Sequence, residues 1–237
     1  MTYLNLRLPF KKYSDPVKNK ACKYFEVDNW VISKFIINEV IPLVGISPYP
    51  LVELQMLVAA VCWFKPRFIY EWGTNVGRSA RIFYEIVKKF KLETAIYSID
   101  LPDNVNHVEH PHKNRGRFIK GIKEIHLYQG DGITSSLTLI KQLKSKYKIL
   151  FFLDGDHEYK SVKRELFLIG KIVSRAMIII HDTFLQSKES DYNIGPSKTV
   201  QEFLRLSPKK YHVISTNLGL PGMTILIPKF YFSNKNR

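Results

Sequence analysis

Residues 1–27 are polar and basic with no strong period, and apolar positions at helical spacing begin after them. These apolar positions predict one helix over residues 28–41, capped at Asp28 or Asn29 and ended by Pro42. A second helix is expected over residues 51–64. These two helices are followed by a different pattern, so we interpret them as an N-terminal cover on what comes next.

From about residue 66, short apolar runs alternate with amphipathic segments. The runs ILFFL and MIII are apolar without interruption, as expected for parallel strands covered by helices on both faces. Strands are expected at residues 67–72, 95–100, 124–129, 148–154 and 176–182, with helices after Gly77 and over residues 133–146 and 161–173. The segments YHVIST and MTILIP predict a closing antiparallel hairpin.

This alternation predicts an α/β fold. We expect a doubly wound, Rossmann-like seven-stranded sheet, mostly parallel, with a C-terminal antiparallel hairpin and an N-terminal helical extension. The extension would cover residues 1–65 and the α/β domain residues 66–237.

Composition limits the cellular compartment and the binding partners that we expect for the protein. The longest apolar stretch, residues 56–64, is far shorter than the roughly 20 residues of a membrane helix. No export signal is visible, and Cys22 and Cys62 form no CxxC pair, so we expect reduced thiols in a cytoplasmic protein. The net charge of +15 comes from lysines spread along the chain, which favours a solvated surface over a nucleic-acid site.

Ligands of doubly wound sheets bind beyond the carboxyl ends of the strands. The segment EWGTNVGRSA stands at the first such end. Gly73 and Gly77 allow the backbone to approach a ligand closely. The spacing is E-x-G-x-x-x-G from Glu71, unlike the G-x-G-x-x-G turn that binds a pyrophosphate, and this argues against a nicotinamide dinucleotide.

Polar residues also end the next two strands. Asp100 lies where a carboxylate can bind a ribose diol, and Asp131, between two glycines, can accept from an adenine amino group. Together these features predict a cofactor that contains adenosine but no pyrophosphate. S-adenosylmethionine fits this description best. The residues assigned to this cofactor are Glu71, Gly73, Thr74, Asn75, Gly77, Ser79, Asp100, Gly130, Asp131, Gly132 and Asp154.

On these motifs the sequence resembles the class I S-adenosylmethionine-dependent methyltransferases over about residues 66–228. EWGTNVGRSA, LDGDHEYKSVKREL and IIIHDT resemble the branch with metal-dependent macrolide-sugar O-methyltransferases and proteins named cephalosporin hydroxylases. The resemblance implies a divalent metal, Mg²⁺ or a transition metal such as Mn²⁺, held by Asp154, His181 and Asp182. It also implies His157 as the general base.

Two points of this assignment stay open. Relatives often carry a carboxylate where this chain has His181, and imidazole is a poor ligand for Mg²⁺, so either the metal is softer or His181 does not ligate. Asp156 is expected to cap the helix that follows, with Glu158 facing solvent. The loops 107–117 and 185–196 are either parts of the acceptor pocket or plain surface.

The sequence therefore predicts a metal-dependent O-methyltransferase acting on a hydroxyl of a sugar, polyol or other small-molecule or glycan acceptor. RNA ribose methylation and a non-catalytic cofactor-binding subunit are the alternatives. Base-amino and base-C5 methylation lack their motifs, because no Pro-Pro pair occurs and both cysteines precede the cofactor turn. A homo-oligomer is possible.

Overall fold

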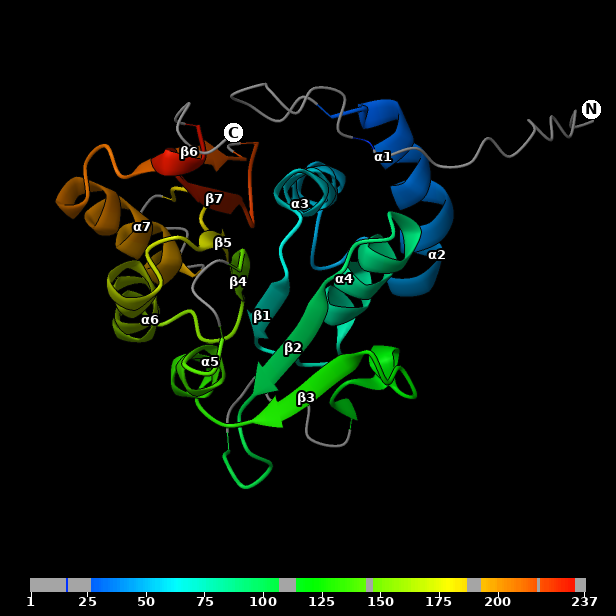
Figure 1. Cartoon of the computed structure of the whole chain (residues 1–237), viewed down its shortest axis with the longest axis horizontal. Coiled ribbons are helices and arrows are strands. Elements are labelled where there is room, and N and C mark those ends of the chain that lie inside the picture. The colour runs from blue at the N-terminus through cyan, green and yellow to red at the C-terminus, as the bar shows by residue number, and fades with distance from the viewer. Residues whose placement is uncertain are drawn as a thin grey trace, which may run out of the picture.

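The structure is a computed structural model that describes residue 16 and residues 27–106, 114–143, 147–186, 193–216 and 218–232. Its strands are β1 (Phe68–Trp72), β2 (Ala95–Asp100), β3 (Ile125–Gln129), β4 (Ile149–Leu153), β5 (Met177–His181), β6 (Tyr211–Ser215) and β7 (Met223–Pro228). They form one sheet in the order β3-β2-β1-β4-β5-β7-β6 (Figure 1). Strands β1 to β5 are parallel, and β7 is antiparallel to β5 and β6. The predicted fold class, with its closing hairpin, is confirmed.

Helices cover both faces of the sheet (Figure 1). They are α1 (Asn29–Phe35), the π-helix η1 (Ile36–Val40), α2 (Ile41–Val44), α3 (Leu51–Phe64), α4 (Arg78–Lys89), α5 (Gly132–Ile140), α6 (Tyr159–Ile172) and α7 (Ile194–Leu206), with short 3₁₀ turns η3 (Arg117–Ile119) and η4 (Lys229–Phe232). Successive strand residues point to opposite faces. Ile69 and Phe152 therefore join the core under α1 to α4, whereas Tyr70 and Phe151 join the core under α5 to α7.

The first helix differs from its prediction at Pro42. Asp28 caps it as expected, since its side chain accepts from the backbone N–H groups of Trp30 and Val31. However, Pro42 does not end it, because the π-helical turn η1 directly precedes α2 and its wider spacing accommodates a proline that donates no hydrogen bond. The chain leaves the helix only at Gly45, with φ 77°.

Other boundaries differ by a few residues. Helix α5 ends at Ile140, where the following residues tighten into a turn, and α6 begins at Tyr159, two residues earlier than expected. Helix α7 begins at Ile194, so Pro196 lies within its first turn, where a missing N–H costs nothing. Helix α3 shares its hydrophobic core with the sheet. The domain boundary at residue 65 stays a prediction.

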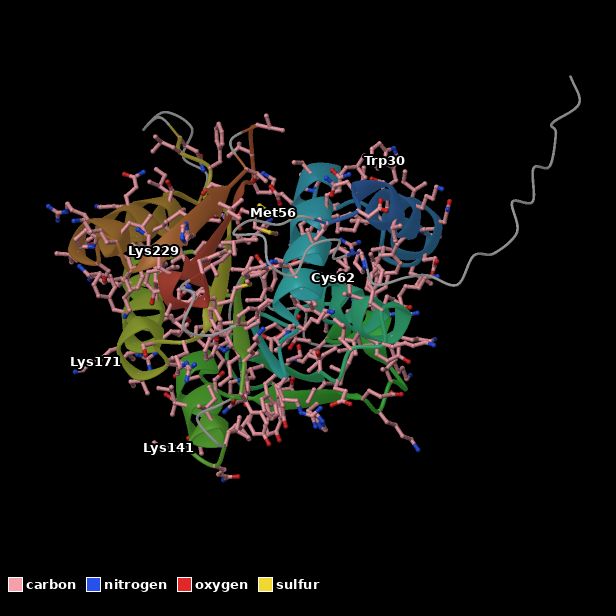
Figure 2. The ribbon with its side chains drawn as sticks, turned by 45° about the horizontal axis from the view of Figure 1, so that its top comes forward. Trp30, Met56, Cys62, Lys141, Lys171 and Lys229 are labelled. Carbon is pink, nitrogen blue, oxygen red and sulfur yellow. The ribbon has the colours of Figure 1, made fainter. Side chains whose placement is uncertain are left out.

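Three of the lysines illustrate how the positive charge is distributed over the molecule. Lys141, Lys171 and Lys229 are exposed and lie apart, on different elements (Figure 2). Cys62 is buried in α3. Within the described part of the chain, no helix combines the length and apolarity that crossing a membrane requires.

Candidate active site

The glycine turn after β1 lies directly against the loop after β4. Gly73 has φ 90°, and its N–H donates to the Ile99 carbonyl at 2.9 Å. A Cβ added at Gly73 would lie 2.2 Å from the Asp154 carbonyl oxygen. The absence of a side chain there therefore lets the two loops meet at backbone distance.

Glu71 lies behind this turn. Its side chain is fully buried and does not line the cavity beside the turn. The Ser98 hydroxyl donates to Glu71 at 2.5 Å and is itself bonded to the Thr74 hydroxyl at 2.6 Å. Glu71 thus orders the turn through Ser98. Burial outweighs these hydrogen bonds and raises the pKa of Glu71 to about 8.

The raised pKa gives a pH prediction for Glu71→Gln. A carboxyl whose pKa rises from 4.5 to about 8 on folding contributes stability that is complete below pH 4.5 and is lost as pH rises through 8. The free energy of unfolding of Glu71→Gln should therefore increase relative to wild type by several kcal/mol over that interval. Urea unfolding at pH 5 and pH 8 measures this. Glu93→Gln, whose parent side chain is 91% exposed, is the control, and equal pH profiles for Glu71→Gln and wild type would refute the assignment.

A cavity of about 710 Å³ opens at the carboxyl ends of β1, β2, β4 and β5. That volume is in the range of small-molecule and cofactor sites. Of the predicted site residues, Gly73, Thr74, Asn75, Ser79, Asp100, Gly130, Asp131, Gly132, Asp154, His157, His181 and Asp182 line it, whereas Glu71 and Gly77 do not. Almost all of the residues predicted from the sequence therefore line this one cavity.

The two carboxylates assigned to adenosine differ in their contacts. Asp100 accepts from the backbone N–H of Asn75 at 2.9 Å, which holds the glycine turn, and it lines the cavity. Both oxygens of Asp131 are bonded to Arg164, at 2.7 and 2.9 Å, and one also accepts from the N–H of Thr134. Hydrogen bonds from Arg164 lower the pKa of Asp131 to about 2. Asp131 therefore caps α5 and pairs with Arg164.

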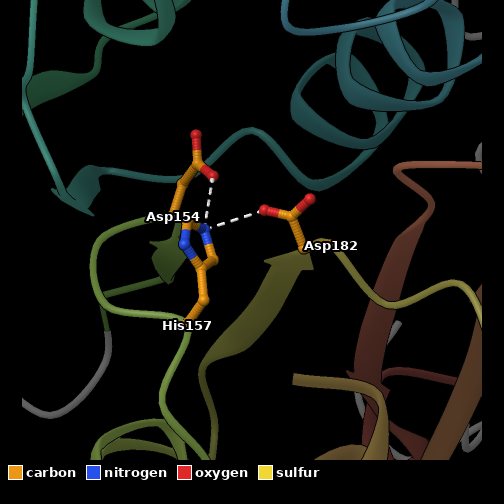
Figure 3. A group of neighbouring side chains, drawn as sticks. All are labelled: Asp154, His157 and Asp182. Carbon is orange, nitrogen blue, oxygen red and sulfur yellow. Dashed lines mark ion pairs between the residues drawn. The ribbon is translucent and has the colours of Figure 1, made fainter. Parts of the chain in front are cut away.

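Three side chains converge where β4 and β5 end (Figure 3). Nε2 of His157 lies 2.8 Å from Oδ2 of Asp182 and 3.9 Å from Oδ1 of Asp154. One ligand atom from each residue falls within a common 4.8 Å. Burial opposes protonation of His157, but its hydrogen bonds to Asp154 and Asp182 outweigh burial and raise its pKa to about 10.

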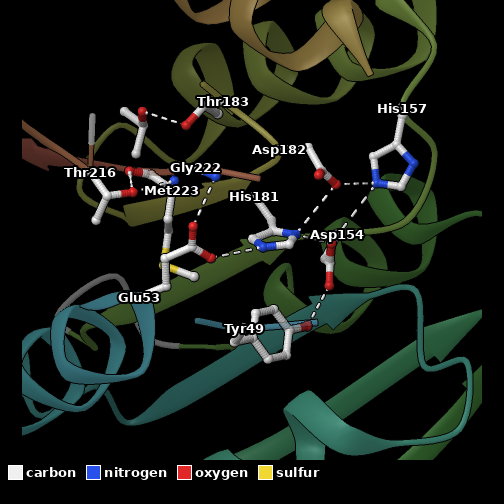
Figure 4. A network of polar contacts seen from close by, with 11 residues as sticks. Tyr49, Glu53, Asp154, His157, His181, Asp182, Thr183, Thr216, Gly222 and Met223 are labelled. Atoms are coloured by element: carbon white, nitrogen blue, oxygen red, sulfur yellow. Dashed lines mark hydrogen bonds and ion pairs between the residues drawn. The ribbon is translucent and has the colours of Figure 1, made fainter. Parts of the chain in front are cut away.

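His181 has a different environment (Figure 4). Its Nδ1 lies 2.9 Å from Oδ1 of Asp154 and 3.3 Å from Oδ2 of Asp182. Its Nε2 lies 3.0 Å from Oε2 of Glu53. Burial lowers the pKa of His181, but the neighbouring Asp154 charge outweighs this and holds the pKa well above its ordinary value. Each ring nitrogen thus already has a carboxylate partner.

Sequence reasoning missed two residues of this site, and both come from the N-terminal helical cover. The Tyr49 hydroxyl donates to Oδ2 of Asp154, and Glu53 of α3 contacts His181 (Figure 4). One signal was available for Glu53. It stands on the buried face of α3, four residues before Leu57, where an acid without a partner is costly.

The site fits a divalent cation in its donor atoms. Oδ1 of Asp182 is buried and has no hydrogen-bond partner among the described residues. A buried carboxylate oxygen without a donor is costly unless a cation or proton meets it. The carboxylate oxygens of Asp154 and Asp182 suit Mg²⁺ and Mn²⁺, whereas the nitrogen donor of His157 suits transition metals.

Asp156 and the two candidate loops gave mixed outcomes. The N-cap of α6 is Glu158, contrary to the expectation for Asp156. The Asp156 side chain accepts from the Glu158 N–H at 2.8 Å in the turn before the helix.

In the first candidate loop, Arg115 bonds the Leu101 carbonyl and pairs with Asp103 at 2.9 Å, so it braces the loop after β2. Arg117 lines the cavity, as does Asn193. Residues 107–113 and 187–192 of the two loops lie outside the described residues.

Comparison with known families identifies the family to which the chain belongs. The family model described as rhamnosyl O-methyltransferase/CmcI matches residues 41–220, which is more than half of the chain. The chain belongs to the rhamnosyl O-methyltransferase/CmcI family. This confirms the resemblance drawn from the sequence, and the protein is an S-adenosylmethionine-dependent O-methyltransferase. The matched region of the family includes Tyr49 and Glu53.

Solved structures share the fold. An O-methyltransferase from Bacillus cereus in complex with SAH is 16% identical, with a TM-score of 0.52 over 81% of this chain and 90% of that one. TomG from Streptomyces achromogenes, in complex with SAM, is 15% identical, with a TM-score of 0.53 over 73% and 78%. CalS11, a TDP-rhamnose 3'-O-methyltransferase, is 15% identical, with a TM-score of 0.50 over 82% and 86%. No curated protein matches the sequence.

Proposed function

We propose that this methyltransferase modifies a hydroxyl of a sugar or polyol acceptor and depends on a divalent cation. The observation that carries the proposal is the convergence of Asp154, His157 and Asp182 in the wall of the cavity that the glycine turn also lines. A carboxylate pair and an imidazole beside a cofactor cavity are the groups that hydroxyl activation requires.

The cofactor would lie along the glycine turn. Gly73 allows its methionine part to approach the backbone, and Asp100 stands where a ribose diol would bind. At the other end, Gly132 lies under the ring of Trp72, where an added Cβ would be 2.6 Å away, so this wall is shaped by an aromatic face. Asp131 also lines the cavity with both of its oxygens bonded to Arg164, and its contact with adenine stays a prediction.

His157 is the proposed general base. It would take the proton of the acceptor hydroxyl while the oxygen attacks the sulfonium methyl, which leaves S-adenosylhomocysteine and a methyl ether. Asp182, 2.8 Å from Nε2 of His157, orients the ring. Asp154 and Asp182 would hold a divalent cation, which would supply Lewis-acid polarisation and offset the two carboxylate charges. Without the pull of those charges, the pKa of His157 would lie below about 10 and nearer its ordinary range, where the ring accepts protons near neutral pH.

We propose Asp154 and Asp182 as the cation ligands and exclude His181 from the set. A histidine ligates through a nitrogen lone pair, and carboxylate oxygens lie within 3.0 Å of both nitrogens of His181. The sequence left open whether the metal is soft or His181 does not ligate, and this geometry favours the second answer. The proposed ligands are therefore carboxylate oxygens, which are compatible with Mg²⁺.

The acceptor proposal rests on the family and on the cavity charge. CalS11 is described as a TDP-rhamnose 3'-O-methyltransferase, and the family model is described as rhamnosyl O-methyltransferase/CmcI. Here Arg78 and Arg117 both line the cavity, with their guanidinium carbons 5.3 and 4.9 Å from the Phe118 ring centroid. Two cations on one wall support a sugar acceptor that carries an acidic group. A cytoplasmic location and a homo-oligomer stay predictions.

Two measurements test this function. Calorimetry should show binding of S-adenosylmethionine and none of NAD, because the turn lacks the pyrophosphate spacing. A screen of glycan, nucleotide-sugar and polyol acceptors with Mg²⁺, Mn²⁺ and EDTA should then show methyl transfer that EDTA abolishes and added metal restores. Full transfer in EDTA would refute metal dependence, and salt-sensitive transfer to RNA alone would favour the ribose alternative.

A further inference from the structure

Glu53 is a carboxylate with two partners on different strands. It is 1% exposed, although it belongs to α3 of the N-terminal cover. Its Oε2 lies 3.0 Å from Nε2 of His181, at the end of β5. Its Oε1 accepts from the Gly222 N–H at 2.8 Å, directly before β7. The single side chain therefore ties α3 to both neighbouring strands (Figure 4).

The far nitrogen of His181 faces the proposed catalytic carboxylates. Nδ1 is 2.9 Å from Asp154 and 3.3 Å from Asp182. The ring is 3% exposed and packs edge-on against Tyr49, with ring centroids 4.9 Å apart. Because the ring is held by Glu53 at one nitrogen, the direction of its other N–H toward Asp154 is fixed.

We propose that Glu53 is a positioning residue for methyl transfer. Acting through His181, it sets the orientation of Asp154 and Asp182, while Tyr49 holds the second oxygen of Asp154. The inference rests on the proposed function of those carboxylates. It assigns part of the active site to the N-terminal helical cover, outside the strands and loops that carry the motifs. Outer hydrogen bonds of this kind orient the groups that ligate or react.

The test compares Glu53→Gln with wild type in the full-length protein. Glutamine keeps the volume, and its carbonyl oxygen can still accept from the Gly222 N–H. Its other polar group is an NH₂, which donates and therefore cannot accept from Nε2 of His181. We expect Mn²⁺ affinity, measured by electron paramagnetic resonance, to fall about 10- to 100-fold, and kcat to fall by a similar factor. The KM for S-adenosylmethionine should stay within about twofold, since Glu53 does not line the cavity.

Two further variants separate positioning from stability. Tyr49→Phe removes only the hydroxyl that contacts Asp154, and it should lower Mn²⁺ affinity less than Glu53→Gln does. Gln55→Ala, whose parent bonds Ser33 at 2.8 Å on the outer side of the same helix, should leave kcat and Mn²⁺ affinity unchanged. A lower melting temperature of Glu53→Gln with wild-type Mn²⁺ affinity and kcat in the folded fraction would overturn the proposal. Absence of Mn²⁺ binding by wild type would instead overturn the proposed function.

Discussion

Replacing Asp182 with Asn is expected to lower kcat for methyl transfer by about a thousandfold, which is the scale of removing a positioned charged group from an active site. Oδ2 of Asp182 orients His157 at 2.8 Å, and Oδ1 is the buried oxygen that finds no hydrogen-bond donor among the described residues. Asparagine keeps the shape, but it removes the charge that would hold both a cation and the imidazole. It also tolerates the left-handed backbone of this residue, with φ 56°.

The measurement is single-turnover methyl transfer at saturating cofactor and metal, together with calorimetry of S-adenosylmethionine binding. Cofactor affinity should change little, because the glycine turn follows β1, whereas Asp182 follows β5. Asp28→Asn is the matched control, since asparagine caps a helix as well as aspartate does, and Asp28 caps α1 outside the cavity. If Asp182→Asn transferred methyl at the wild-type rate, the proposed roles of both Asp182 and His157 would be wrong.

Gly73→Ala is expected to destabilise the protein by roughly 3–5 kcal/mol and to abolish cofactor binding in what remains folded, because clashes with rigid backbone cost more than ordinary overpacking. The new methyl group would lie 2.2 Å from the Asp154 carbonyl oxygen and 2.8 Å from Cα of Gly155. Neither atom belongs to a side chain that can turn away. Relief would require the loops after β1 and β4 to separate.

Gly121→Ala isolates the contribution of backbone conformation. Gly121 has φ 83°, close to the 90° of Gly73, but nothing lies within 4 Å of an added Cβ. It should lose only about 1 kcal/mol, the usual cost of an alanine in a left-handed conformation. Chemical denaturation and cofactor calorimetry compare the two variants. Equal losses at both positions would show that the contact with Asp154 is unimportant.

The sequence predicted the site best where residues follow the strands directly. Gly73, Asp100, Asp154 and His157 all follow or end strands, and parallel strands bring such residues to one edge. Pairings between distant segments were not predictable. Arg164 pairs with Asp131 across 33 residues, and no local sequence pattern indicates that contact.

The N-terminal cover also has contacts with distant segments that could not be predicted from the sequence. Its apolar spacing predicted helices over residues 28–41 and 51–64, and the structure has helical residues at both places. It did not predict which element would lie opposite Glu53, since that depends on how α3 docks beside β5 and β7. The π-helical turn before Pro42 was also missed, because a helix that widens around a proline has no distinct apolar pattern.

The contacts of Glu53 also bear on when the protein becomes active during its own synthesis. Its partners His181 and Gly222 lie 128 and 169 residues further along the chain. Helix α3 is synthesised before every strand of the sheet, yet its carboxylate stays without either partner until β5 and the turn before β7 have been made. Local release of α3 in the finished protein would likewise silence catalysis while the central strands remain paired. Catalytic activity is thus a more stringent reporter of complete folding than cofactor binding, which relies on the turns after β1 and β2.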